Sequence, residues 1–197
     1  MRRLRRALLR LPILLALAVA ALAAPRPAEA SEAEAWAALE RPGAVALMRH
    51  ALAPGTGDPA DFALGDCATQ RNLSERGREQ ARRVGEGLRA RGVGFDRVLT
   101  SEWCRCRETA DLLGLGRPEP LSALNSFFGR YAERDTRTEA ARAFLAAQPP
   151  ESRLLLVTHQ VNISALVGTG ARSGEVVVAR RGADGSLTPV GSIRIDP

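Results

Sequence analysis

The chain has 197 residues, 28 of them basic and 22 acidic, with a formal net charge of +6 and a sequence pI near 10.7. Every basic side chain is an arginine, which excludes a P-loop lysine, a Schiff-base lysine and a pyridoxal-type attachment. Two histidines, His50 and His159, are too few for zinc enzymes built on HExxH or on several histidines. We therefore expect no metal and no organic cofactor. A chain of this length usually forms one domain, which buries roughly 70% of the surface that the unfolded chain exposes.

The first thirty residues have the pattern of a secretory leader. Five arginines within the first ten residues are followed by an unbroken apolar stretch over residues 11–24. This stretch is about 14 residues long, whereas a membrane-spanning helix needs roughly 20. Small residues favour cleavage after Ala30, and residues 21–23 offer a second cleavage pattern.

Cleavage after Ala30 would leave a single domain over residues 31–197. The leader pattern predicts a periplasmic or secreted protein with no stable membrane insertion once the leader is removed. It would also remove six arginines and one glutamate, which lowers the net charge from +6 to +1. An uncleaved N-terminal anchor is the alternative interpretation of residues 1–30.

The three cysteines allow at most one intramolecular disulfide. In a helix that starts at Ser101, Cys106 would lie on the face of Ala110, whereas Cys104 would lie on a more exposed face. We therefore favour a bridge between Cys67 and Cys104. The alternative is that all three cysteines are reduced and pack as small apolar side chains.

Strand patterns and helix patterns alternate along the rest of the chain. Strands are predicted at residues 43–48, 97–100, 154–158, 175–180 and 187–195, the last two joined across Asp184-Gly185. Helices are predicted from Ser74 to Gly92, from Ser101 to Leu113, from Thr136 to Pro149, and over residues 162–167. This alternation predicts an α/β fold, a three-layer sandwich with a mostly parallel central sheet and helices on both faces.

Polar residues mark the starts of three predicted helices. Ser74 and Ser101 are candidate N-caps. Thr136 and Glu139 have the spacing of a capping box. The loop over residues 51–70 is rich in glycine and proline, and we expect it to cover the ligand pocket.

Both histidines directly follow predicted strands. The first strand ends at Arg49-His50, and the third ends at His159-Gln160. The second strand runs through Ser101 into a helix that carries Arg105. Because ligands of open α/β sheets bind at the carboxyl ends of the strands, we expect these side chains to meet at one rim.

The residue types at this rim indicate an anion with several oxygens. Arginine presents a planar fork of donors that fits phosphate and stays charged at any working pH. The neighbouring charges of Arg49 and Arg105 would keep His50 neutral, and a neutral imidazole can act as a nucleophile. Adjacent strand residues point to opposite faces, so Arg49 and His50 can converge only where the strand ends.

Four motifs resemble the histidine phosphatase superfamily, also called the phosphoglycerate mutase-like family. The first is Leu-Met-Arg-His-Ala at residues 47–51, and the second is Arg-Asn-Leu-Ser-Glu-Arg-Gly from residue 71. The others are the segment over residues 101–110 and Val-Thr-His at residues 157–159. They occur in the expected order and cover most of the chain from residue 43 onward.

The resemblance implies a role for each residue at the rim. His50 would be the nucleophile that becomes a phosphohistidine, and Arg49 would bind the phosphoryl oxygens. The following Thr-Ala pair selects Arg105 over Arg107 as the second arginine. His159 would donate to the phosphoryl group and stabilise its charge during transfer.

Two positions depart from the family pattern. Asn125 stands where many members have a glutamate that acts as general acid, and Gln160 stands where another branch has an aspartate. Glu133 or Asp135 would then supply the proton, or the leaving group would need little help, as in a phosphohistidine or an anhydride. We also consider Asn125 and Gln160 as substrate-binding residues.

The leading hypothesis is an exported, metal-independent phosphatase that hydrolyses a phosphomonoester or a phosphoramidate through a phosphohistidine on His50. Its substrate would be a small phosphorylated molecule, for which an envelope sugar phosphate is an attractive candidate. The alternative is a non-catalytic phosphate-binding protein of the same fold. Nucleic-acid binding is disfavoured, because the arginines over residues 76–83 are interleaved with glutamates as on a solvated helix face.

Overall fold

Six strands form one sheet in the computed structural model, which describes residues 32–195. The strands are β1 (Ala44–Arg49), β2 (Arg97–Thr100), β3 (Pro118–Pro120), β4 (Leu154–Thr158), β5 (Val176–Arg181) and β6 (Leu187–Ile193). Their spatial order is β3-β2-β4-β1-β5-β6. The first four in that order are parallel, whereas β5 runs antiparallel to both β1 and β6.

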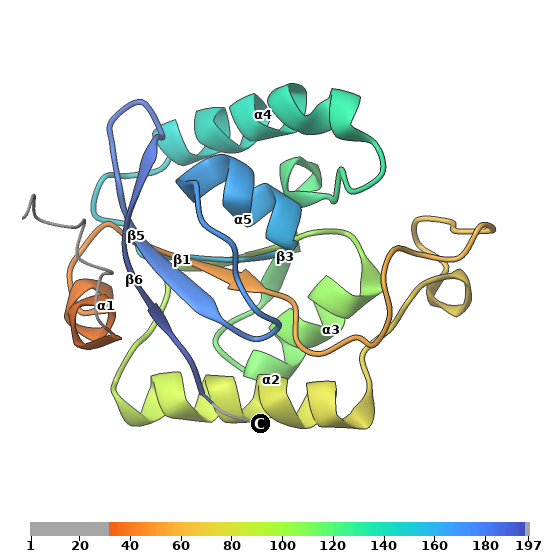
Figure 1. Ribbon diagram of the computed structural model, residues 1–197. Helices are drawn as coiled ribbons and strands as arrows, with labels where there is room; N and C mark the ends of the chain where they lie inside the picture. Colours follow the sequence, from red (N-terminus) through yellow and green to blue (C-terminus); the bar gives the residue numbers. More distant parts are fainter. Residues whose placement is uncertain (1–31, 196–197) are drawn as a thin grey trace, which may run out of the picture.

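Helices cover both faces of this sheet (Figure 1). The α-helices are α1 (Glu32–Leu39), α2 (Glu75–Ala90), α3 (Cys104–Leu113), α4 (Arg134–Ala146) and α5 (Gln160–Val167). Three short 3₁₀ turns are η1 (Cys67–Thr69), η2 (Ser122–Leu124) and η3 (Tyr131–Glu133). Helices α4 and α5 lie on one face, and α2 and α3 lie on the other. The predicted three-layer α/β architecture is therefore confirmed.

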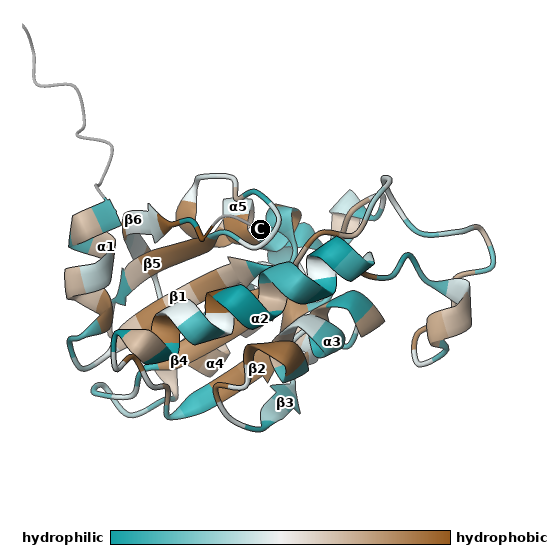
Figure 2. Cartoon of the chain, turned by 90° about the horizontal axis from the view of Figure 1, so that it is seen from below, coloured by the Kyte–Doolittle hydropathy of each residue, from teal (hydrophilic) through white to brown (hydrophobic). Residues whose placement is uncertain are grey.

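The alternation of β1 explains the two layers. Ala44, Ala46 and Met48 belong to the apolar cluster under α1, α2 and α3, whereas Val45 and Leu47 belong to the cluster under α4 and α5. Successive strand residues point to opposite faces, so a strand that is covered on both sides needs apolar residues throughout. Figure 2 shows this contrast between the apolar strands and the polar outer surface of α2.

Helix α2 follows its predicted course closely. Ser74 is its N-cap, and the Ser74 hydroxyl accepts a hydrogen bond from the Gly77 N–H. The Leu52 carbonyl accepts a hydrogen bond from the Ser74 N–H at 3.1 Å, and a Cβ added at Gly77 would lie 2.1 Å from the same oxygen. Glycine at position 77 therefore lets the helix approach the chain that leaves β1.

Two local predictions are wrong. Ser101 does not cap α3, whose N-cap is Trp103, because the Ser101 hydroxyl instead contacts His159. Thr136 lies inside α4, which begins at Arg134 without a side-chain cap, so there is no capping box. Cys104 is buried, but it is more exposed than Cys106, at 6% against 0%, as predicted.

Two elements have no counterpart among the predicted ones. Helix α1 packs on β5 and β6, and its Trp36 and Leu39 are buried. Strand β3 contains Pro118 and Pro120, which cannot donate to a neighbouring strand. It is tolerated because it pairs only with β2, at the edge of the sheet.

The predicted leader and its cleavage site lie outside the described residues. No helix within residues 32–195 has both the length and the apolar character needed to cross a membrane.

Candidate active site

The carboxyl ends of β1, β2 and β4 meet at one edge of the sheet because these three strands are parallel neighbours. The backbone N–H of His50 donates to the Thr158 carbonyl at 3.0 Å, and that of Ser101 donates to Val157 at 3.0 Å. Strand β1 ends at Arg49, so His50 leaves the strand as required for the two side chains to converge. The imidazole rings of His50 and His159 lie 5.5 Å apart. The structure thus brings both histidines together at the predicted rim.

His50 is buried and held by one specific hydrogen bond. The residue is 2% exposed, and its Nδ1 lies 2.8 Å from the Ala51 carbonyl oxygen. A carbonyl can only accept, so Nδ1 carries the proton and Nε2 keeps its lone pair in the neutral ring. The pKa of His50 is lowered to about 3, mainly by burial and additionally by the charges of Arg105, Arg49 and Arg71. The expected neutral imidazole is present, but burial is a larger cause than the arginines.

The charges of Arg49, Arg71 and Arg105 act on the His50 ring. Arg105, on the first turn of α3, is 3% exposed, whereas the neighbouring Arg107 is exposed. Arg49 donates through Nη1 to the Gln160 side chain at 2.9 Å and to the Ala171 carbonyl at 3.2 Å. The Nε atoms of Arg49 and Arg105 are buried and have no hydrogen-bond partner. These unpartnered donors indicate a site for an anion.

The site arginines also repel one another. Burial lowers the pKa of Arg49, and the charge of Arg105 lowers it further. Burial likewise lowers the pKa of Arg71, and Arg105 adds to this effect. An oxyanion bound between them would relieve this repulsion.

His159 follows β4 and begins α5. Its Nε2 lies 2.9 Å from the Ser101 hydroxyl and 3.4 Å from the Cys106 sulfur. Burial lowers the pKa of His159 well below 6.5, and the charges of His50 and Arg105 lower it further. Burial raises the pKa of the Cys106 thiol to about 12, so this cysteine stays protonated and is not a nucleophile.

Asn125 holds Ser101, which contacts His159, and an amide side chain cannot act as a general acid. Its Oδ1 accepts hydrogen bonds from the Ser101 hydroxyl at 3.2 Å and from the Glu102 N–H at 2.9 Å. Its Nδ2 donates to the Glu102 carboxylate at 2.6 Å. Asn125 therefore fixes Ser101, which in turn orients the His159 ring. Gln160 is exposed and holds the Arg49 guanidinium.

The two carboxylates predicted as substitute acids do not contact the histidines. Glu133 pairs with Arg137 at 2.5 Å and with Arg130 at 3.5 Å, and Asp135 is exposed in the first turn of α4. In residues 32–195, no group of three or more His, Cys, Asp and Glu side chains is arranged to bind a metal ion.

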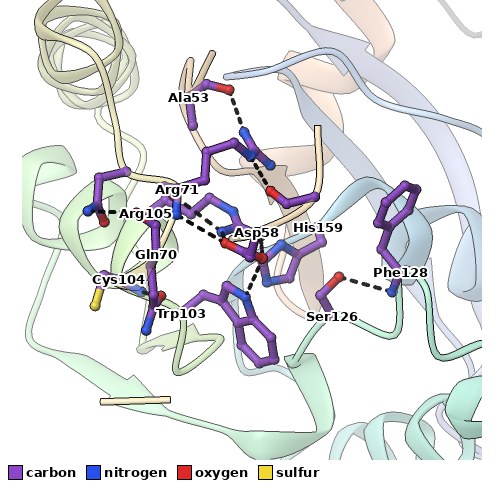
Figure 3. Close-up of polar contacts among 12 residues, drawn as sticks. Ala53, Asp58, Gln70, Arg71, Trp103, Cys104, Arg105, Ser126, Phe128 and His159 are labelled. Atoms are coloured by element: carbon purple, nitrogen blue, oxygen red, sulfur yellow. Dashed lines mark hydrogen bonds and ion pairs between the residues drawn. The ribbon is translucent and has the colours of Figure 1, made fainter. Parts of the chain in front are cut away.

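The loop over residues 51–70, which we call the roof loop, brings two features to the site. The Asp58 carboxylate lies on the Arg105 guanidinium, between it and the Trp103 ring (Figure 3). The disulfide between Cys67 and Cys104 joins the loop to the residue before Arg105, so the favoured pairing is confirmed. Most of the roof loop projects beyond the helices in Figure 1, whereas Asp58 contacts Arg105, so only part of the loop lies at the site.

Asp58 and Trp103 were missing from the predicted site. Asp58 follows no strand and belongs to no motif, so the sequence contains no local signal for it. Trp103 lies within the motif segment over residues 101–110 but was not singled out. Arg71 was recognised only as part of a motif. Its Nε donates to the Gly57 carbonyl at 2.7 Å and its Nη1 donates to Ala53, which ties the roof loop to the pocket.

Comparison with known proteins identifies the class to which this fold and site belong. Residues 45–127, which include His50, Arg71 and Arg105, match the histidine phosphatase superfamily (branch 1). This match spans less than half of the chain and supports its membership of the superfamily.

Individual relatives cover different parts of the chain. A mitochondrial serine/threonine-protein phosphatase, Pgam5 of Drosophila willistoni, is 38% identical over 65 residues, which are 33% of this chain and 22% of that protein. SixA of Agrobacterium tumefaciens, described as a candidate phosphohistidine phosphatase, is similar in structure, with a TM-score of 0.56 and 20% identity. Phosphoglycerate mutase of Thermus thermophilus gives a TM-score of 0.54 and 16% identity. Each of these two structures covers 78% of this chain and is itself covered over 99% of its length.

Proposed function

We propose that this protein is a phosphatase in which His50 is transiently phosphorylated. One observation carries the proposal: a neutral, buried imidazole with a free Nε2 lies beside two arginines whose Nε donors lack partners. A phosphoryl group would satisfy those donors and place its phosphorus near the nucleophile. Positioning and charge stabilisation account for most of the catalysis of phosphoryl transfer, and arginines can provide both.

The reaction would proceed in two displacements. In the first, the Nε2 lone pair of His50 attacks phosphorus, a P–N bond forms, and the bond to the leaving oxygen or nitrogen breaks. In the second, water attacks phosphorus, the P–N bond returns its electrons to Nε2, and inorganic phosphate leaves with the water oxygen. Arg49, Arg105 and His159 would stabilise the transferring phosphoryl group in both steps, so we propose that no metal is needed.

Within residues 32–195, two of the positions considered for the general acid are engaged with other side chains, which constrains the leaving group. Asn125 is engaged with Ser101 and Glu102, and Glu133 is engaged with Arg137. We therefore propose that the enzyme acts on phosphoramidates such as phosphohistidine, or on phosphomonoesters with good leaving groups, faster than on alkyl phosphates. The description of SixA as a candidate phosphohistidine phosphatase is consistent with this preference.

We further propose that the protein works outside the inner membrane, in the periplasm or as a secreted protein. The leader pattern of residues 1–30 supports export, and so does the disulfide between Cys67 and Cys104, because disulfides persist in oxidising compartments. A small phosphorylated molecule of the envelope, such as a sugar phosphate, would then be within reach.

The test is hydrolysis of an aryl phosphate and of a phosphoramidate by the purified protein in excess chelator. We expect activity that His50→Ala abolishes, together with an acid-labile phosphoenzyme. Asp61→Asn serves as a matched control, because Asp61 is an exposed roof-loop residue outside the site. Phosphate binding without turnover or phosphoenzyme would instead establish the alternative, a non-catalytic phosphate-binding protein.

A further inference from the structure

The Asp58 carboxylate is held by more hydrogen bonds than its place in a loop would require. Oδ1 accepts from Arg105 Nη1 at 2.6 Å and from the Arg71 backbone N–H at 3.2 Å. Oδ2 accepts from Arg105 Nη2 at 3.1 Å and from Trp103 Nε1 at 3.1 Å. The Asp58 side chain is 16% exposed, and that of Arg105 is 3% exposed. These two groups therefore form a bidentate ion pair largely shielded from solvent.

A count of the Arg105 donors shows what the ion pair leaves free. A guanidinium has five N–H groups. Nη1 uses its two on Asp58 and on the Arg71 carbonyl at 3.3 Å, and Nη2 uses one on Asp58. The second N–H of Nη2 and the unpartnered Nε–H remain, and they share one edge of the guanidinium plane. Asp58 thus occupies the end of the guanidinium and leaves a two-donor edge available for an anion.

Asp58 is poorly suited to act as the missing general acid. Burial by itself would raise the pKa of Asp58, but the hydrogen bonds and charge of Arg105 lower it below its usual value. The group is therefore ionised at neutral pH and has no proton to donate. Both of its oxygens are already occupied by donors from the protein.

We propose that Asp58 is a positioning residue, which holds Arg105 so that its Nε–Nη2 edge faces the phosphoryl group during transfer. This inference rests on the proposed function and adds a residue to it. Asp58 also contributes a negative charge among Arg49, Arg71 and Arg105, which lets the three cations lie close together before substrate binds. Through Asp58, the roof loop contributes one residue to the phosphoryl-binding apparatus.

The first measurement compares Asp58→Ala with the control Asp61→Asn. A misplaced catalytic group typically costs about 100-fold in rate, so we expect Asp58→Ala to lower kcat by roughly 10- to 100-fold. The loss should be the same for aryl and alkyl phosphates, because positioning does not depend on the leaving group. Binding of vanadate, which resembles the transition state, should weaken more than binding of inorganic phosphate. Asp61→Asn should leave all of these unchanged.

Chemical rescue distinguishes positioning from competition for the anion site. Added formate should restore part of the kcat of Asp58→Ala, because a free carboxylate can fill the space on Arg105. Higher activity and tighter phosphate binding in Asp58→Ala, with inhibition by formate, would overturn the proposal, because Asp58 would then be a competitor of substrate. A loss confined to alkyl phosphates would overturn it too, in favour of a general acid.

Two further readouts keep the result interpretable. Thermal unfolding of Asp58→Ala and Asp58→Asn reports whether either variant is merely unfolded, and the disulfide keeps the loop attached in both. If the unmodified protein has no activity on any substrate, the proposed function fails. The vanadate and phosphate affinities then still report on Asp58, and unchanged affinities in both variants would overturn its positioning role.

Discussion

Arginines lie at both ends of the central sheet, and their surroundings differ. At the amino end, Arg97 donates to both oxygens of Glu119 and to the Gln148 side chain. Arg181 donates at the same end to the carbonyls of Leu145, Pro149 and Pro150. These guanidinium groups are satisfied within the protein. At the carboxyl end, the site arginines retain buried Nε donors without partners.

The directions of the pKa shifts follow burial and pairing at both ends. Burial lowers the pKa of Arg181 at the amino end. Hydrogen bonds with Glu119 raise the pKa of Arg97, whereas burial and the neighbouring Arg105 lower the pKa of Arg49. A raised arginine pKa reflects a charge that the fold already neutralises. A lowered pKa reflects burial without a neutralising carboxylate, and it occurs at both ends. The unpartnered Nε donors of Arg49 and Arg105 therefore distinguish the arginines that can bind an anion from the structural ones.

Substituting one arginine from each end gives the largest expected effect. Arg105→Ala should lower kcat/KM by about 1000-fold or more, because an arginine on the transferring phosphoryl group contributes on that scale. Arg97→Ala should leave the activity unchanged and cost at most about 1 kcal/mol of stability, because its ion pair with Glu119 is partly exposed. Steady-state kinetics and thermal unfolding of both variants provide the measurement. Equal activity losses at the two ends would contradict the distinction.

The disulfide at the site end gives the next largest effect. The bridge between Cys67 and Cys104 closes a loop with a sequence separation of 37 residues. In the chain-entropy treatment, opening such a loop costs about 4 kcal/mol of stability at 25 °C. Denaturant unfolding with and without a thiol reductant would measure this loss. Cys67→Ser should show the same loss without reductant and no further change with it, since Cys106 is buried and free.

The buried histidines at the site end predict an effect on stability that is absent at neutral pH and develops only as the pH falls. The pKa of His50 is lowered to about 3 and that of His159 lies well below 6.5, so the unfolded chain takes up protons first as the pH falls. Stability should therefore decrease as the pH falls from 6.5 toward 3, by about 1.4 kcal/mol per pH unit for each histidine. Unfolding free energies across this range, compared with those of His50→Gln, would measure the slope. A variant slope equal to that of the unmodified protein would contradict a neutral, buried His50.

Much of the fold could be predicted from local patterns. Arg97–Thr100 and Leu154–Thr158 form strands with the predicted boundaries, and α2 begins after its predicted N-cap, Ser74. These elements are long or strongly patterned, and each signal lies within a few neighbouring residues. The site residues His50 and His159 were found in the same way, because each directly follows an apolar strand.

The two wrong capping predictions have different physical causes. Thr136 lies within α4, because that helix begins at Arg134. Ser101 has the residue type and spacing of a helix cap, yet its hydroxyl contacts His159. A hydroxyl forms a hydrogen bond with whichever group the tertiary structure brings close. A local sequence pattern cannot predict a hydrogen-bond partner 58 residues away. Strand β3 was missed for a similar reason, since only its place at the sheet edge makes its prolines acceptable.

The sequence by itself limited the chemistry of the site. It has no lysine, it has two histidines that follow strands, and it has arginines that can bind a phosphoryl group. Only the tertiary structure decided the order of the strands and the contact of Asp58 with Arg105. The roof loop has no hydrophobic periodicity from which its structure could be predicted. Its position depends on a disulfide and on hydrogen bonds to distant residues. Such contacts depend on how separate segments meet in space, which no short stretch of sequence encodes.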